Sequence, residues 1–317
     1  MKLRKSLILL SIIPLSSCGG DVLNRDVFAF DTMNSLHLYS GSKEDLDNLE
    51  SIINDIDKHT DNYKERDVLN VTKINKTNED VQIDSELYEI LKVGDELSKD
   101  IAPFSIYCGG LAKLWKESLN NQQIPDESLR NAEVEKIKNT SLEFKEGNVV
   151  RRLGDGEIDL GAIAKGYALD KCYSYLKEHE IADYYLSMGF SSNLLGDKTY
   201  YGAEEFEVEI KNSNWRLKLH NCFISTSGIS EQSVTIDGVV YSHIVNPNTG
   251  KATPIYNTVL VVSNNGLIGD ALSTAFMLSS LDNIKAMEEK YNVKSLILSG
   301  NDNVVYSHPD LNTFKAK

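Results

Sequence analysis

The sequence predicts an α+β protein in which antiparallel strands pack against helices. Strand-like and helix-like segments follow one another without the regular βαβ alternation of a parallel sheet. Short alternating segments separated by turn residues run from Phe206 to Val245, a pattern typical of antiparallel pairing. The 317 residues fit one large domain or two closely packed ones. Hydrophobic residues make up 41% of the chain, which supports a globular fold with a large core.

The individual elements follow from apolar spacing and from residues that favour helix starts and turns. Ser42 and Asp84 each precede an apolar series at helical spacing, and Ser and Asp are preferred N-caps. In chain order, the sequence predicts a strand at 36–38, a helix over 42–56, a helix over 84–97, a polar and partly helical excursion over 122–140, a helix over 163–176, an apolar strand over 184–186, the antiparallel segments over 206–245, helices over 268–278 and 281–290, and a closing strand over 295–298.

The N-terminus predicts export from the cytoplasm. A basic start is followed by the apolar run Leu7–Leu15, which is too short to span a bilayer and is typical of a signal peptide. Leu15-Ser-Ser-Cys18 resembles a bacterial lipobox, in which Cys18 would be acylated and become the mature N-terminus. An ordinary signal peptide with an incidental cysteine is the alternative. With the lipobox, we expect a protein anchored by lipid to the outer face of the cell membrane.

These features divide the chain into three parts. We expect a lipoprotein signal peptide over 1–17, a tether over 18–26 and a single functional domain over 27–317. The balance of 33 basic against 47 acidic residues gives a net charge of −14, which argues against nucleic acid as a partner. The other cysteines are odd in number and widely spaced, so they predict neither a disulfide framework nor a zinc site; they are Cys108, Cys172 and Cys222.

Two glycine-containing segments could bind an anionic ligand or a substrate. In Ile158–Ala168, Asp159 is expected to end a strand, and the following helix would offer free N–H groups near the charge of Lys165. The segment lacks the glycine spacing of dinucleotide and Walker phosphate loops, so on its own it is a weak signal. On its own, Ile224–Gly228 is better interpreted as a strand that runs into a turn.

Two further segments carry groups suited to catalysis. His243 ends an expected strand beside the turns of Asn246–Gly250, where it could act as a general base or serve only structure. Asp270 and Thr274 lie four residues apart on a predicted helix and therefore face the same way. A carboxylate and a hydroxyl suit Mg²⁺, although an N-cap aspartate and an ordinary helical threonine would give the same pattern.

Taken in order, the four segments resemble the ApbE family, the FAD:protein FMN transferases. That family shows IDLGGIAKGYA, TSG, SHI-DP-TG and ADALAT along its chain. The matching stretches here are Ile158–Ala168, Thr226–Gly228, Ser242–Gly250 and Gly269–Thr274. Weaker similarity to the family's opening and FD…GPL…LW stretches is present at Phe30–Thr32 and from Pro103 to Trp115.

The resemblance implies a site and a reaction. It implies that FAD contacts Phe30, Phe104, Asp159, Lys165 and Ile244, that Mg²⁺ is held by the carbonyl of Ala162 with Asp270 and Thr274, and that His243 is the catalytic base. The implied reaction transfers FMN from FAD to a Thr or Ser hydroxyl of an acceptor flavoprotein and releases AMP. The implied acceptor belongs to an exported or membrane electron-transfer system. Hydrolysis of FAD to FMN and AMP, and flavin binding without catalysis, are the alternatives.

Several positions depart from the family pattern. Ser105 stands where the family usually has Asp, and Phe30 stands where many members have Met. Ala162 and Asn246 replace a frequent Gly or Thr and a frequent Asp, and Met188–Asn193 differs from the usual GGD or GGN run. These departures concern flavin affinity and pocket geometry, because the predicted metal ligands and His243 are all present.

Overall fold

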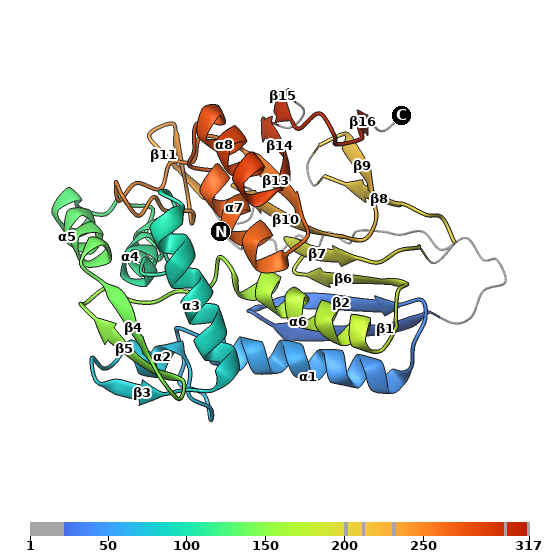
Figure 1. The fold of residues 1–317 in the computed structure, drawn as a ribbon. Coiled ribbons are helices and arrows are strands. Elements are labelled where there is room, and N and C mark those ends of the chain that lie inside the picture. Colours follow the sequence, from blue (N-terminus) through green and yellow to red (C-terminus); the bar gives the residue numbers. More distant parts are fainter. Residues whose placement is uncertain (1–21, 200–201, 211–212, 230–232, 301–302, 316–317) are drawn as a thin grey trace.

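The computed structural model describes residues 22–199, 202–210, 213–229, 233–300 and 303–315 (Figure 1). Within these ranges the chain forms eight helices and sixteen strands, and the predicted α+β class is confirmed. The helices are α1 Lys43–Thr60, α2 Val71–Ile74, α3 Ser85–Asp100, α4 Gly109–Asn120, α5 Glu127–Lys138, α6 Ala164–Glu178, α7 Gly266–Phe276 and α8 Leu281–Tyr291. The strands are β1 Leu23–Ala29, β2 Thr32–Leu38, β3 Asp80–Gln82, β4 Ser141–Lys145, β5 Val149–Leu153, β6 Tyr184–Met188, β7 Ser192–Leu195, β8 Phe206–Glu209, β9 Trp215–Leu219, β10 Cys222–Gly228, β11 Ser233–Ile236, β12 Val239–Ser242, β13 Thr258–Ser263, β14 Lys294–Ser299, β15 Asn303–Ser307 and β16 Thr313–Lys315.

An eight-stranded antiparallel sheet organises the molecule, in the order β1-β2-β6-β7-β10-β13-β14-β15. Side chains alternate between its faces, so neighbouring residues enter different cores. On β7, Leu194 packs in the core beneath α1 and α6, whereas Leu195 packs in the core beneath the small sheet β8-β9-β16. Figure 1 shows α1 and α6 lying side by side on the first of these faces.

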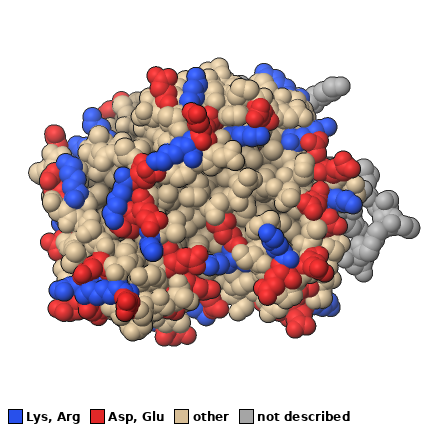
Figure 2. All heavy atoms as spheres, viewed as in Figure 1, with Lys and Arg blue, Asp and Glu red and all other residues tan. Residues whose placement is uncertain are grey.

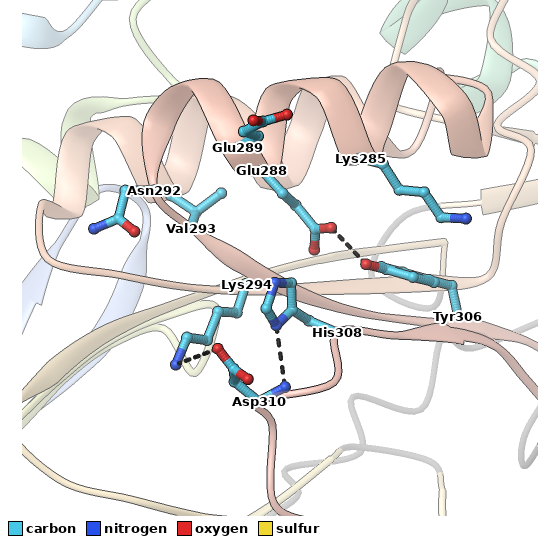
Figure 3. A pocket seen from close by; sticks show the side chains of 9 residues that line it. All are labelled: Lys285, Glu288, Glu289, Asn292, Val293, Lys294, Tyr306, His308 and Asp310. Atoms are coloured by element: carbon cyan, nitrogen blue, oxygen red, sulfur yellow. Dashed lines mark hydrogen bonds and ion pairs between the residues drawn. The ribbon is translucent and has the colours of Figure 1, made fainter.

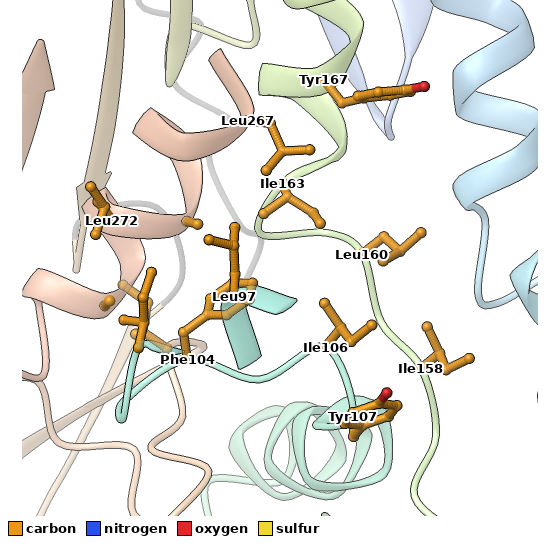
Figure 4. Close-up of a cluster of buried hydrophobic side chains, with 14 of the residues drawn as sticks. Leu97, Phe104, Ile106, Tyr107, Ile158, Leu160, Ile163, Tyr167, Leu267 and Leu272 are labelled. Carbon is orange, nitrogen blue, oxygen red and sulfur yellow. The ribbon is translucent and has the colours of Figure 1, made fainter. Parts of the chain in front are cut away.

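A second group of elements, α2 to α5 with the small sheet β3-β5-β4, lies beside the main sheet (Figure 1). The largest hydrophobic cluster joins this group to the main sheet and to α7. In Figure 4, Leu97 and Ile106 from the second group lie near Ile163, which directly precedes α6, and Leu267, which lies in the first turn of α7. Both helix starts are therefore anchored in the same core.

Local helix signals were the most accurate predictions. Ser42 caps α1 through a reciprocal capping box with Asp45, and Asp84 caps α3 by accepting the N–H of Leu87 at 2.8 Å. The predicted helices over 163–176, 268–278 and 281–290 correspond to α6, α7 and α8, with ends shifted by at most two residues.

Two boundaries were predicted wrongly. Asp159 does not end a strand, because it lies in an irregular segment whose N–H donates to the carbonyl of Ile106 at 2.7 Å rather than to a neighbouring strand. The predicted tether over 18–26 extends too far, since residues 23–26 belong to β1 and pair with β2. The signal peptide and Cys18 lie outside the described residues. The sequence also left α4 and the β4–β5 hairpin unpredicted.

The described part of the chain contains no helix long and apolar enough to cross a bilayer. Its cysteines behave as small hydrophobic residues: Cys172 and Cys222 are buried, Cys108 is half-buried, and all three are free thiols. Burial raises the pKa of each thiol. Figure 2 shows basic and acidic side chains interspersed over the face that it presents.

Candidate active site

Two glycines allow the starts of α6 and α7 to touch. A Cβ atom added to Gly166 would lie 2.1 Å from the carbonyl oxygen of Gly266, and one added to Gly266 would lie 2.3 Å from the carbonyl oxygen of Gly166. No side chain fits at such distances, so the backbones meet only because both positions lack one. The predicted segments around Lys165 and Asp270 are brought together by this contact.

The Asp270 side chain occupies the junction. It is 6% exposed and accepts hydrogen bonds from three directions. One oxygen accepts the backbone N–H of Gly166 at 2.6 Å, and the other accepts the hydroxyls of Ser225 at 2.6 Å and Ser192 at 2.8 Å. Burial raises the pKa of Asp270, and the charge of Lys165 together with these hydrogen bonds opposes that rise. The carboxylate therefore links α7 to α6, β7 and β10.

The positive charge of Lys165 lies at the same junction. Its ammonium group donates to the hydroxyl of Ser191, in the turn between β6 and β7. Ser191 and the next residue, Ser192, thus contact Lys165 and Asp270 respectively. An ammonium group held in this way can offer a charge-assisted hydrogen bond to a phosphate.

The oxygen atoms at this junction fit a hard cation. In a regular helix the N–H of Gly166 would bond to the carbonyl of Ala162, but here it donates to Asp270. Among the described residues, no hydrogen bond ends on the Ala162 carbonyl. Thr274 lies one turn after Asp270, with its hydroxyl 3.4 Å from that of Ser227. A carbonyl, a carboxylate and a hydroxyl are ligands that Mg²⁺ accepts.

No cluster of three or more His, Cys, Asp or Glu side chains suited to a metal occurs among the described residues. A metal at this junction would therefore depend on the backbone and hydroxyl oxygens as well as on the single carboxylate of Asp270. That requirement matches the ligand set that the resemblance implies.

The start of α6 is less open to an anion than the sequence suggested. Four of the six backbone N–H groups over 161–166 are already bonded within the protein: those of Gly161 to Asp159, Ile163 and Ala164 to Leu160, and Gly166 to Asp270. An anion near this turn would meet the N–H groups of Ala162 and Lys165, and the Lys165 ammonium would contribute most of the charge.

The other predicted flavin contacts fall into two groups. Asp159 is partly exposed, and its charge acts with burial to raise the pKa of Tyr63 to about 12, as does the charge of Asp31. Asp31 lies in the β1–β2 turn beside half-buried Phe30, which has a left-handed backbone (φ 55°) and bonds through its N–H to Asp57 at 2.7 Å.

Phe104 and Ile244, in contrast, are each 4% exposed and belong to the largest hydrophobic cluster. Both side chains are therefore buried in the hydrophobic core of this structure. His243 directly follows β12, at the strand end that the sequence predicted. Its side chain is exposed. The structure thus gathers Ala162, Lys165, Asp270 and Thr274 at one junction.

Sequence reasoning missed a second carboxylate at the same place, which is half-buried. Asp170 on α6 accepts the N–H groups of Gly266 at 2.6 Å and Leu267 at 2.8 Å, which are the first two residues of α7. Burial is the main cause that raises its pKa to about 6, and the charge of Asp270 adds to the rise. A usable signal was present, because Asp170 follows Gly166 by four residues and shares its helix face.

A separate hollow of about 390 Å³ lies between α8 and the end of the chain (Figure 3). Several of its polar groups form hydrogen bonds or ion pairs with one another. Tyr306 donates to buried Glu288 at 2.7 Å, and Lys294 lies 3.7 Å from Asp310. It contains none of the predicted site residues.

Comparison with known proteins tests the resemblance directly. The model of the ApbE family matches residues 30–297, which is most of the sequence and includes all four segments. The chain belongs to the ApbE family.

Relatives of this ApbE-family chain carry one shared name. A protein of Klebsiella pneumoniae (strain 342) named FAD:protein FMN transferase is 26% identical over 212 residues, covering 65% of this chain and 66% of the relative. One of Rhodobacter capsulatus with the same name is 27% identical over 249 residues, covering 73% and 45% respectively. The chain thus spans less than two thirds of the length of each of these relatives.

Solved structures share the fold. The ApbE protein of Thermotoga maritima superposes with a TM-score of 0.75 at 23% identity, covering 87% of this chain and 94% of that one. The apo form of the Pseudomonas stutzeri flavinyl transferase ApbE gives 0.75 at 19% identity, with coverages of 96% and 97%. The ApbE fold therefore extends over nearly the whole described chain.

Proposed function

We propose that this chain is a Mg²⁺-dependent FAD:protein FMN transferase. The observation that supports the proposal is the α6–α7 junction, where Asp270 accepts the N–H of Gly166, next to Lys165, although the two segments lie about a hundred residues apart in the chain. The shared name of its relatives supports the same reaction.

Each of these residues has a distinct proposed role. Ala162, Asp270 and Thr274 would hold Mg²⁺, which neutralises pyrophosphate charge when bound. Lys165 would attract a phosphate of FAD and orient it beside the junction. Asp159, which precedes this turn in the chain, would contact another part of the cofactor.

His243 would accept the proton of the acceptor hydroxyl as that oxygen bonds to the FMN-side phosphorus. The bond from this phosphorus to the bridging oxygen then breaks, and AMP leaves with that oxygen. With a Thr or Ser hydroxyl as acceptor, the product is FMN joined to protein by a phosphoester. With water as acceptor, the products are FMN and AMP.

We propose that the acceptor is a flavoprotein of an exported or membrane electron-transfer system, which this chain meets through a lipid at Cys18. The motif around Cys18 supports the location, and the variant Cys18→Ala tests it. Loss of the chain from the membrane fraction is expected. Unchanged membrane association, with no lipid mass on the mature N-terminus, would refute the anchor.

The reaction is tested by incubating the full chain with FAD and Mg²⁺, with and without an acceptor flavoprotein domain. Flavin bound covalently to the acceptor is the expected result. AMP released equally well without acceptor would identify a hydrolase, which is the second enzymatic possibility. FAD bound without turnover in either arm would identify a carrier of flavin and refute catalysis.

The role of His243 is tested in the same assay with His243→Ala and, as a matched control, His220→Ala, which also removes an exposed histidine. Loss of a general base should lower turnover by roughly a hundredfold while FAD binding persists. Full activity of His243→Ala would remove this residue from the mechanism.

A further inference from the structure

We propose that Asp170 is a positioning residue for the metal site, holding the first turn of α7 so that Asp270 and Thr274 point at the Ala162 carbonyl. The proposal rests on the Mg²⁺ site of the proposed function. It adds a residue that touches neither metal nor substrate and acts through the backbone of α7.

The first observation is that the two helices cap each other. Asp270 on α7 accepts the N–H of Gly166 on α6 at 2.6 Å. Asp170 on α6 accepts the N–H groups of Gly266 and Leu267 on α7 at 2.6 and 2.8 Å. Both carboxylates are largely enclosed, where a charge-assisted hydrogen bond to backbone N–H is strong.

The second observation is that Asp170 completes the first turn of α7. The other two N–H groups of that turn are satisfied locally, since Ile268 donates to the Asn265 side chain at 2.8 Å and Gly269 donates to the Asn265 carbonyl at 3.1 Å. Without Asp170, the N–H groups of Gly266 and Leu267 would lose their partners. The turn that leads into Asp270 would then be held by Asn265 alone.

The third observation is that this turn has little room to move in the native arrangement. Gly266 is in backbone contact with Gly166, and a Cβ on Gly269 would lie 2.8 Å from the Ser263 hydroxyl and 3.0 Å from the Ser225 hydroxyl. Ser225 is itself a partner of Asp270. A small displacement of the turn therefore changes the position of the Asp270 carboxylate directly.

The test compares Asp170→Asn with Asp84→Ala in the full chain. Each oxygen of Asp170 accepts one N–H, so in the asparagine variant the side-chain NH₂ group must face a donor, while the size of the side chain is preserved. Asp84→Ala removes a helix cap of the same chemical kind from α3, and the N–H that it caps belongs to Leu87 rather than to a residue of α6 or α7. Mn²⁺ affinity is measured by calorimetry on each protein without FAD, and FMN transfer is measured as a function of Mg²⁺ concentration.

For Asp170→Asn, we expect Mn²⁺ affinity to fall by at least about tenfold and the Mg²⁺ concentration for half-maximal transfer to rise by a similar factor, the usual effect of groups that orient metal ligands. Saturating Mg²⁺ should restore most of the transfer rate. Asp84→Ala should leave both metal readouts unchanged.

Unchanged Mn²⁺ affinity in a folded Asp170→Asn protein would overturn the inference, as would an equal loss in Asp84→Ala. A wild-type chain that binds Mn²⁺ but transfers no FMN would overturn the proposed function alone, and the Mn²⁺ comparison would still decide the role of Asp170. A wild-type chain that binds no Mn²⁺ would overturn the metal site and this inference together.

Discussion

The helices of this chain begin in two different ways. α1 and α3 are capped by Ser42 and Asp84, which lie directly before the helix in sequence. α6 and α7 are capped across the junction by carboxylates 104 and 96 residues away along the chain, which in α7 adds to the local cap Asn265. A local cap stabilises its own helix and places nothing else. A reciprocal pair also fixes two helices relative to each other, which is what a site built from both of them requires.

The largest effect should come from separating the two helix backbones. Gly166→Ala places a methyl group 2.1 Å from the Gly266 carbonyl oxygen, and backbone atoms cannot swing aside as a side chain can. We expect a loss of at least about 3 kcal/mol in the free energy of unfolding, the upper range for overpacking. Urea denaturation measures it. Gly147→Ala is the control, because no atom lies within 4 Å of its Cβ position, although its φ of 74° adds some backbone strain. Equal losses in both variants would show that the close contact is unimportant.

A pH titration should give the next largest effect. Since folding raises the pKa of Asp170 from 3.8 to about 6, the unfolded chain loses this proton first as the pH rises. The contribution of Asp170 to the free energy of unfolding should therefore fall by about 3 kcal/mol between pH 4 and pH 6 and then stay level.

The measurement is the difference between wild type and Asp170→Asn in urea denaturation at each pH from 4 to 7. Taking the difference cancels the other titrating groups common to both proteins. A difference that does not vary with pH would show that Asp170 is ionised as easily in the folded chain as in the unfolded one.

Among these variants, removal of the Asp270 carboxylate on α7 should lower the rate of FMN transfer most. Asp270→Ala deletes the proposed charged ligand and leaves Gly166, Ser192 and Ser225 without their acceptor. We expect Mg²⁺-dependent transfer to fall by about a hundredfold, equivalent to about 2.7 kcal/mol in the activation barrier. Transfer rates at limiting Mg²⁺ test this. A rate equal to wild type would exclude Asp270 as a metal ligand.

A local cap should give the smallest effect. Asp84→Ala removes the acceptor for the Leu87 N–H, and loss of an N-cap typically costs about 1 kcal/mol. The midpoint of thermal unfolding should drop slightly while the transfer rate stays unchanged. If transfer fell together with stability, local and reciprocal caps would not differ in function, and the distinction drawn above would fail.

This contrast also explains how far the sequence could be interpreted. Ser42 and Asp84 were predictable because a local cap needs only a polar residue beside an apolar helical series. Asp270 and Thr274 were found by their spacing, which a helix converts into a shared face. Asp170 was missed because its partners, Gly266 and Leu267, are joined to it only by the packing of two helices.

Other differences between the sequence expectations and the structure have the same origin. Asp159 was expected to end a strand before the helix that follows, yet its backbone bonds to Ile106 across a loop. Phe104 and Ile244 could be recognised as apolar from the sequence, but whether they face a ligand or the core depends on the neighbours that the fold supplies. Patterns within ten residues were predictable from spacing. Contacts across a hundred residues were not, except where the family resemblance implied them, as for Ala162 and Asp270.

The reciprocal caps also affect the order in which the parts of the chain fold. Closing a loop of about 100 residues costs about 3 kcal/mol more in chain entropy than closing one of three, on the usual logarithmic scaling. Until α7 reaches α6, Asp170 and Asp270 both lack the backbone donors that compensate their burial. The junction should therefore assemble late, after the sheet has already brought β10 and β13 together. A chain that has folded everywhere else would still be inactive, so activity itself reports that folding is complete.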